Sequence, residues 1–167
     1  MHDELTEVDL RKMREEIEYR TKVLRPKLIE DVQTARGFGD LSENFEYKCA
    51  KRDKNRNDSR IRYLEGMIRT AKVISAESGA DTAGLFDEVE IYNEKMDAVQ
   101  KIRIVTTLRQ DALKGLISKE SPVGRAVLGH GVGERLLVEV SPELKFYIVI
   151  RSIAKGKDDD SLEISAY

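Results

Sequence analysis

The feature that most constrains this chain is a repeat of residues three and four positions apart over its first 74 residues. Before residue 37, this spacing predicts a helix whose seam has Arg20 in one position and apolar side chains in the others: Leu10, Met13, Ile17, Leu24 and Leu28. A stricter seam follows, formed by Tyr47, Ala50, Lys54, Asn57, Ile61, Leu64, Ile68 and Ala71. Such spacing puts residues on one helix face and is typical of coiled coils. We therefore predict helix from residue 5 to about residue 74.

The repeat is interrupted at residues 37–40, which read GFGD. Gly37 and Gly39 allow the backbone conformations of a tight reversal. Two periodic helices joined by a short turn form an antiparallel hairpin. Pro26 lies inside the first helix and should kink it there, because proline lacks the backbone donor that a helix needs.

The pattern changes after Ile74. Residues 76–84 are small and polar, which predicts a linker. Residues 85–154 then read as a small α+β domain, with a short helix between Ser121 and Gly129. Four strands are predicted from alternation and β-branched content, at Glu88–Tyr92, Lys101–Leu108, Leu136–Val140 and Phe146–Ile153. The fold class is thus α+β: residues 1–75 form a coiled-coil hairpin, and residues 155–167 an acidic tail that we expect to be loosely ordered in part.

Composition excludes several classes of protein. Charged residues make up 36% of the chain, which suits long exposed helices better than one large core. No apolar run is long enough to span a membrane. Cys49 is the one cysteine, so there is no internal disulfide and no cysteine–histidine zinc site. The expected location is the reducing cytoplasm.

Two groups of charged residues allow two interpretations each. Residues 48–62 hold seven basic and two acidic side chains, which is either a solvated helix face or a stripe that binds a polyanion. Asp40 and Glu43 flank Leu41 and Ser42 in the form of a capping box, with Asp40 as N-cap and Glu43 at the third helical position. Alternatively, the hairpin carries these two carboxylates at its tip in order to do chemistry. Spacing alone favours the capping interpretation.

The stretch ARGFGDLSENFEY and the later stretch SPVGRAVLGHGVGE decide how the hairpin is interpreted. Both resemble motifs of the Gre family, the bacterial transcript cleavage and elongation factors of the GreA and GreB type. The family's tip motif is G-D-L-S-E-N-x-E-Y, and this chain matches it from Gly39 to Tyr47, with Phe45 where alanine is frequent. The resemblance covers most of the chain, but it is weak over residues 75–120.

The resemblance implies a fold and a function. The hairpin would be followed by a C-terminal domain like the FK506-binding proteins, which docks on RNA polymerase. The hairpin would enter the polymerase secondary channel and stimulate hydrolysis of the nascent RNA 3′ end in backtracked complexes. The protein would then not be an enzyme by itself, would act as a monomer and would bind no cofactor alone. Mg²⁺ would be shared with the polymerase active site.

The resemblance also assigns residues. Asp40 and Glu43 would be the catalytic pair and would bind Mg²⁺ only within the polymerase complex, with Ser42, Asn44 and Phe45 as auxiliary tip residues. Basic side chains near the tip would contact RNA: Arg36, Lys48, Lys51 and Arg52. Polymerase docking would fall on Ser121, Pro122, Arg125 and Gly129.

Three alternatives remain open at this point. A protein of the same fold could occupy the channel and inhibit the polymerase without any cleavage. The C-terminal domain could be a prolyl isomerase, although residues 85–153 hold only four aromatic side chains and the chain has no tryptophan. The hairpin could also be a plain coiled-coil adaptor, in which case changes at its tip would have no effect.

Overall fold

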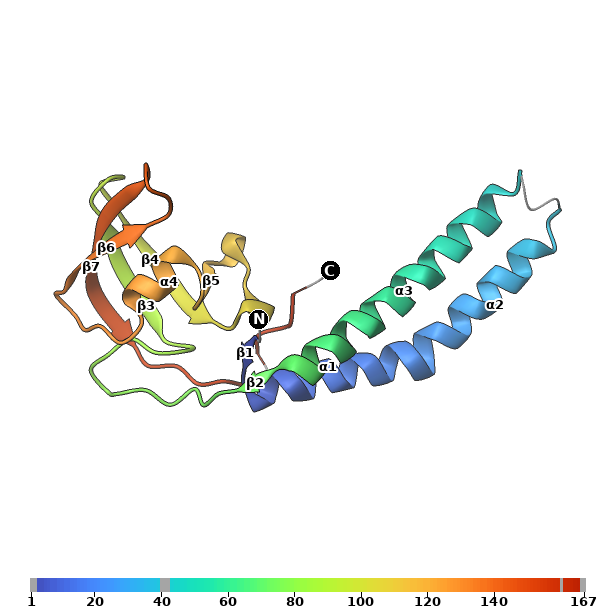
Figure 1. Ribbon diagram of the computed structural model, residues 1–167, viewed down its shortest axis with the longest axis horizontal. Helices are drawn as coiled ribbons and strands as arrows, with labels where there is room; N and C mark the ends of the chain where they lie inside the picture. Colours follow the sequence, from blue (N-terminus) through green and yellow to red (C-terminus); the bar gives the residue numbers. More distant parts are fainter. Residues whose placement is uncertain (1–2, 40–42, 160, 166–167) are drawn as a thin grey trace. The chain divides into compact units, whose positions relative to one another are not determined.

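The computed structural model describes residues 3–39, 43–159 and 161–165 (Figure 1). The chain divides into two compact units. The hairpin unit is Leu10–Ala71, and the sheet unit combines the described residues of Met1–Asp9 with those of Lys72–Ala166. Residues 3–9 thus group with the C-terminal part of the chain, and the hairpin unit ends at residue 71, before the expected boundary at 75. Within the described residues, no helix is long and apolar enough to cross a membrane.

Long helices form the predicted hairpin. The first arm contains α1 (Glu7–Tyr19), a π-helical segment (Arg20–Leu24) and α2 (Arg25–Arg36). The second arm is α3 (Phe45–Thr70), which lies antiparallel to α2 in Figure 1. All the seam positions predicted in both arms are buried or half-buried. The seam is therefore confirmed, and it comprises the residues through which the two arms pack.

The kink predicted at Pro26 takes the form of a wide turn. Pro26 is the second residue of α2, and the helix continues into α2 from the π-helical segment before it, so the missing N–H removes one backbone bond. In a regular α-helix its ring would press against the carbonyl of Lys22. The π-helical segment lies directly before it, and the N–H of Arg25 donates to the carbonyl of Arg20, five residues back. A π turn of this kind changes the spacing of the backbone bonds without ending the helix.

A polar layer interrupts the apolar seam near the π-helical segment. Arg20 Nη1 donates to Asn57 Oδ1 at 3.0 Å, and Asn57 Nδ2 donates to the Arg20 carbonyl at 3.1 Å. Glu16 accepts from Arg20 Nε at 2.7 Å and from Arg60 Nε at 2.9 Å. Two of the polar residues that the sequence places in the seam, Arg20 and Asn57, therefore meet each other across the hairpin.

The sheet unit contains a five-stranded sheet in the order β5-β4-β3-β7-β6. Its strands are β3 (Glu88–Asn93), β4 (Ala98–Val105), β5 (Leu116–Ser118), β6 (Arg135–Glu139) and β7 (Lys145–Ala154). β4 and β5 run parallel and the other neighbours antiparallel. The core lies on one face of the sheet, where the fully buried side chains include Phe86, Val89, Ile91, Ile104, Val138, Ile148 and Ile150.

The four predicted strands are present, but the prediction for β4 was partly wrong. β4 begins three residues earlier than expected and ends at Val105, and a 3-10 helix follows at Thr107–Arg109. The three-residue β5 was not predicted. Nor was a parallel pair of two-residue strands, β1 (Glu4–Leu5) and β2 (Lys72–Val73). Strands this short carry too few residues for an alternating pattern.

The short helix α4 (Pro122–Val127) has the predicted ends. The Ser121 hydroxyl accepts from the Gly124 N–H at 3.0 Å, which caps the helix. Gly129 follows the helix with φ 81°, a conformation that favours glycine. A Cβ on Gly124 would lie 2.1 Å from the carbonyl oxygen of Ser118, so only glycine lets α4 approach β5 this closely. Val127 is fully buried in the core.

The segments predicted as linker and tail pack on the sheet unit. Lys155 Nζ lies 2.5 Å from the buried carboxylate of Asp87 and also donates to Ser78, Gly79 and Thr82. The N–H of Gly156 donates to Asp87 as well, at 2.9 Å. Asp87 and Lys155 thus link residues 78–82 to the start of the tail. This part of the tail is therefore ordered.

A second cluster ties the start of α1 into the sheet unit. Thr6 and Asp9 cap α1 reciprocally: the Thr6 N–H donates to Asp9, and the Asp9 N–H donates to the Thr6 hydroxyl. Arg109 lies between two carboxylates, 2.6 Å from Asp9 Oδ1 and 2.6 Å from Asp158 Oδ1. The Thr6 hydroxyl also donates to Asp158. We call Thr6, Asp9, Arg109 and Asp158 the Arg109 cluster.

Candidate functional site at the tip of the hairpin

The tip joins the end of α2 to the start of α3. The N–H of Gly37 donates to the Thr34 carbonyl at 3.0 Å, and the N–H of Phe38 donates to the Ala35 carbonyl at 3.2 Å, so the first arm ends in a tight turn. Gly39 follows with φ 133°, which only glycine adopts readily. Asp40 and Ser42, two of the predicted tip residues, lie outside the described residues, and so does Leu41.

The described end of the loop presents exposed side chains. Glu43 is exposed and forms no ion pair with any described residue. The phenyl rings of Phe38 and Phe45 are 67% and 76% exposed, and together with Glu43, Asn44 and Glu46 they line a shallow depression. Apolar burial therefore does not hold this end of the loop in place. A carboxylate and two aromatic rings are open to an incoming partner.

The capping box predicted from Asp40 to Glu43 was wrong. α3 begins at Phe45, and its N-cap is Asn44, whose Oδ1 accepts from the Tyr47 N–H at 3.0 Å. Glu43 therefore precedes the helix and cannot take the third helical position. Asn44 also donates from Nδ2 to the Ala35 carbonyl at 2.6 Å. This hydrogen bond reaches the other arm, so the local sequence around Asn44 does not predict it. It favours Asn44 as the N-cap of α3.

Arg36 and Tyr47 form a second link between the two arms. The guanidinium carbon of Arg36 lies 5.4 Å from the centroid of the Tyr47 ring, and Nη2 donates to the phenol oxygen at 3.5 Å. The hydrogen bond from Arg36 lowers the pKa of the Tyr47 hydroxyl, because it stabilises the phenolate. Arg36, predicted to contact RNA, already has a partner within the hairpin.

The basic residues of α3 separate into two groups. Lys54 and Arg60 pair with acidic residues of the hairpin, at 3.0 Å to Asp58 and 2.9 Å to Glu16. The second group, Lys48, Lys51, Arg52 and Arg56, lines a shallow groove along the exposed face of α3 together with Asn55 and Ser59.

Most charges of that groove are not neutralised. Lys48, Lys51 and Arg56 form no ion pair with the described residues, and Arg52 is 4.0 Å from Asp53. We call Lys48, Lys51, Arg52 and Arg56 the basic face. Three of its members were predicted as RNA contacts, whereas Arg56 was missed, although its spacing of four residues from Arg52 indicates the same face. Unpaired positive charge along a helix attracts a polyanion.

The four predicted docking residues have different roles in the sheet unit. Ser121 and Pro122 begin α4, and the Gly129 N–H donates to the Ala83 carbonyl at 2.8 Å, so these three shape the backbone. Arg125 is exposed, and its side chain forms no hydrogen bond or ion pair with the described residues. Of the four, Arg125 is therefore the side chain that remains available to a partner.

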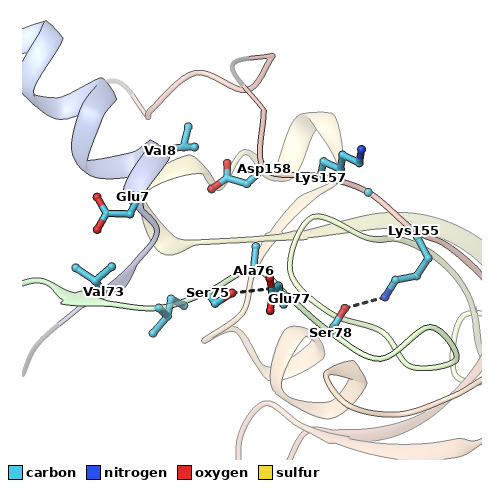
Figure 2. Close-up of a pocket in the computed structure, with 12 residues that line it drawn as sticks. Glu7, Val8, Val73, Ser75, Ala76, Glu77, Ser78, Lys155, Lys157 and Asp158 are labelled. Atoms are coloured by element: carbon cyan, nitrogen blue, oxygen red, sulfur yellow. Dashed lines mark hydrogen bonds between the residues drawn. The ribbon is translucent and has the colours of Figure 1, made fainter.

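The sheet unit also has an open groove between residues 73–78 and 155–158 (Figure 2). Lys155 on its rim points toward Ser78, and Lys155 and Asp158 are held by Asp87 and Arg109, respectively. These side chains are thus engaged in structural contacts. Across the described parts of both units, no three histidine, cysteine, aspartate or glutamate side chains gather in a way that would hold a metal ion.

Two models of one protein family match consecutive parts of the chain. The first, described as the N-terminal part of a transcription elongation factor, matches residues 4–73. The second, described as the C-terminal part of transcription elongation factor GreA/GreB, matches residues 72–154. The chain belongs to the Gre family of transcription elongation factors. Both matches end before the tail, so residues 155–167 lie outside the part that the Gre models describe.

Named relatives agree with this assignment. The chain is 40% identical over 137 residues to transcription elongation factor GreA of Caldanaerobacter subterraneus subsp. tengcongensis, which covers 81% of this chain and 87% of that protein. It is 36% identical over 128 residues to GreA of Bacillus subtilis, covering 77% and 82%. The solved structure of GreA factor homolog 1 (Gfh1) of Thermus thermophilus is 23% identical, with a TM-score of 0.43, and covers 93% of this chain and all of that one.

Proposed function

We propose that this Gre-family protein binds RNA polymerase, inserts its hairpin into the secondary channel and stimulates cleavage of the RNA 3′ end in backtracked complexes. The observation that carries the proposal is the tip itself. Glu43 stands exposed at the end of a helical hairpin, without an ion-pair partner among the described residues. A carboxylate kept free in this way is available to a site on another molecule.

The chemistry of the tip fits a shared magnesium site. Mg²⁺ takes oxygen ligands and is usually held by one or two carboxylates together with water and substrate oxygens. Glu43, together with Asp40 in the loop, would supply such ligands, and the remainder would come from the polymerase and the RNA. When bound, magnesium stabilises the attacking and leaving oxygens of phosphodiester hydrolysis. The protein alone would then leave RNA intact.

The basic face supplies the second part of the proposal. The basic face lies on α3, after Glu43 in the sequence, and three of its four side chains form no ion pair with the described residues: Lys48, Lys51 and Arg56. They would hold the phosphates of the RNA that backtracking displaces, since such contacts position a nucleic acid without reading its sequence. Exposed Phe45 is placed to stack on an unpaired base. We expect the factor to work as a monomer in the cytoplasm, with Arg125 contributing to docking.

The test compares the wild type with Asp40→Asn, Glu43→Gln and Glu46→Gln in a cleavage assay on stalled, backtracked complexes. Glu46 is also exposed and unpaired among the described residues, so it controls for the loss of one charge near the tip. We expect Glu43→Gln and Asp40→Asn to lower the cleavage rate by roughly 10²-fold. Glu46→Gln should stay close to the wild type, and all variants should compete equally for polymerase.

Other outcomes distinguish the alternatives. A wild type that leaves the RNA uncut and slows synthesis would be an inhibitor that occupies the channel. Equal cleavage by the wild type, Asp40→Asn and Glu43→Gln would show that the carboxylates are structural. Loss of polymerase binding in step with cleavage would show the same.

A further inference from the structure

The side chain of Asn44 joins the ends of two helices. Its Oδ1 accepts from the Tyr47 N–H at 3.0 Å, and its Nδ2 donates to the Ala35 carbonyl at 2.6 Å. The first N–H groups and the last carbonyls of a helix have no partner within that helix. One amide therefore satisfies a free donor of α3 and gives the Ala35 carbonyl, which already accepts from the Phe38 N–H, a second hydrogen bond from the other arm.

The position of this amide matters because it adjoins Glu43. The exposed rings of Phe38 and Phe45 give the loop little apolar support. Consecutive Cα atoms are 3.8 Å apart, so anchoring residue 44 confines the backbone from which the Glu43 side chain projects. Arg36 and Tyr47 also link the arms, but their contact lies one helical turn further from Glu43.

We infer that Asn44 is a positioning residue, which fixes the Glu43 carboxylate for the magnesium site of the polymerase. This inference rests on the proposed function and adds to it a residue that acts through Glu43. Only a side chain that both accepts and donates can make the two contacts at once. A residue that merely caps α3 would leave the link to Ala35 open and Glu43 free to move.

Two substitutions separate these contacts. Serine caps helices about as well as asparagine, but its hydroxyl is too short to replace the amide at the Ala35 carbonyl. Asn44→Ser should therefore keep the start of α3 and lose the link between the arms, whereas Asn44→Ala loses both. Gln33→Ala is the matched control, because Gln33 is an exposed amide on α2 whose side chain forms no hydrogen bond with the described residues.

The experiment uses the full chain and three measurements: hydrogen exchange of the Tyr47 backbone amide by NMR, competition for polymerase, and the cleavage rate as a function of Mg²⁺ concentration. In Asn44→Ser we expect wild-type protection at Tyr47 and binding within about twofold. The Mg²⁺ concentration for half-maximal cleavage should rise about tenfold, as for other residues that orient a metal ligand. In Asn44→Ala the Tyr47 amide should also exchange faster.

Several results would overturn the inference. The same Mg²⁺ dependence for Asn44→Ser as for Gln33→Ala would leave Asn44 a plain structural residue. So would a joint loss of polymerase binding and cleavage in Asn44→Ser. Exchange of the wild-type Asn44 side-chain amide as fast as a free amide would show that the link to Ala35 is absent. A wild type without cleavage activity but with a protected Asn44 amide would refute the proposed function and the positioning role, while the link itself would stand.

Discussion

Each of the two units contains an arginine between polar partners, and the two clusters differ in their access to water. In the polar layer of the hairpin, the Glu16 and Arg20 side chains are 20% and 28% exposed. In the Arg109 cluster, the Arg109 and Asp9 side chains are both 0% exposed. Arg109 also packs against the ring of Phe86, at 4.9 Å from its centroid, and its Nη2 has no hydrogen-bond acceptor among the described residues.

The difference shows what an ion pair contributes in each setting. In the polar layer Arg60 is buried, but Glu16 and Arg20 keep part of their hydration, so the cost of burying this carboxylate is smaller than that of burying Asp9. Polar pairs at seam positions help to fix the register of two helices. Arg109 and Asp9 have lost their hydration completely, and each therefore depends on the other. An arginine–carboxylate pair should therefore be weakly stabilising in the polar layer of the hairpin and indispensable in the Arg109 cluster of the sheet unit.

Removing Arg109 should have the largest effect. Arg109→Met keeps much of the side-chain volume but leaves Asp9 buried without its cation, and breaking a buried pair in this way costs about 3–5 kcal/mol. Calorimetry and hydrogen exchange should show this loss in the strands of the sheet unit. The control is Arg125→Met, since Arg125 is exposed in the same unit. If Arg109→Met lowered the free energy of unfolding no more than Arg125→Met, the proposed difference between the two clusters would be wrong.

An intermediate effect is expected at Glu16. Burial alone would raise the pKa of this carboxyl, but hydrogen bonds from Arg60 and Arg20 outweigh burial and lower it. Glu16→Gln should destabilise the hairpin by about 1–2 kcal/mol at pH 7, because the side chain is partly hydrated. Urea denaturation followed by helical circular dichroism measures this, with exposed Glu15→Gln as control.

The effect at Glu16 should depend on pH in one direction. Since the pKa is lower in the folded chain, the ionised carboxylate stabilises the fold above the unfolded value of 4.5. This contribution is lost as the pH falls from about 4.5 through the folded pKa, where Glu16 becomes protonated in both states. The difference between the wild type and Glu16→Gln should therefore shrink at acidic pH. A difference that grows on acidification would contradict the assignment.

The smallest effect is expected at Lys22, which lies 2.7 Å from Glu18 on the solvent side of the hairpin. The hydrogen bond from Lys22 lowers the pKa of Glu18, but both side chains are well hydrated. Lys22→Met should unfold at the same urea concentration as Lys27→Met, which removes an exposed lysine without an ion-pair partner among the described residues. A lower urea midpoint for Lys22→Met than for Lys27→Met would show that exposed ion pairs also stabilise the hairpin.

The sequence predicted those parts of the fold that depend on local pattern. The seam from Tyr47 to Ala71, the glycine turn and the capped ends of α4 each follow from spacing and residue type. The start of α3 did not, because Asp40 and Asn44 are both good N-caps, and the contact of Asn44 with Ala35 distinguishes them only in three dimensions. The form of the bend at Pro26 was equally undetermined, since a missing donor allows either a kink or a π turn.

The candidate site was predictable only in part. The tip motif identified Glu43 and Asn44, but the basic stretch did not reveal which charges are neutralised. That depends on Glu16 and Asp58, of which Glu16 is more than 30 residues away in the sequence. The same holds for Asp9 and Arg109, a hundred residues apart, which no pattern of spacing connects.

The pairing of β1 with β2 and of Asp9 with Arg109 has a consequence for how the chain is made. The hairpin unit uses residues 10–71 alone, so it can form before the rest of the sheet unit has been synthesised. Residues 4–9 have to wait for Lys72, Arg109 and Asp158 to be synthesised. Residues 4–9 thus find their partners later than the hairpin residues that follow them, and a nascent chain stopped before Arg109 would leave Asp9 without its cation.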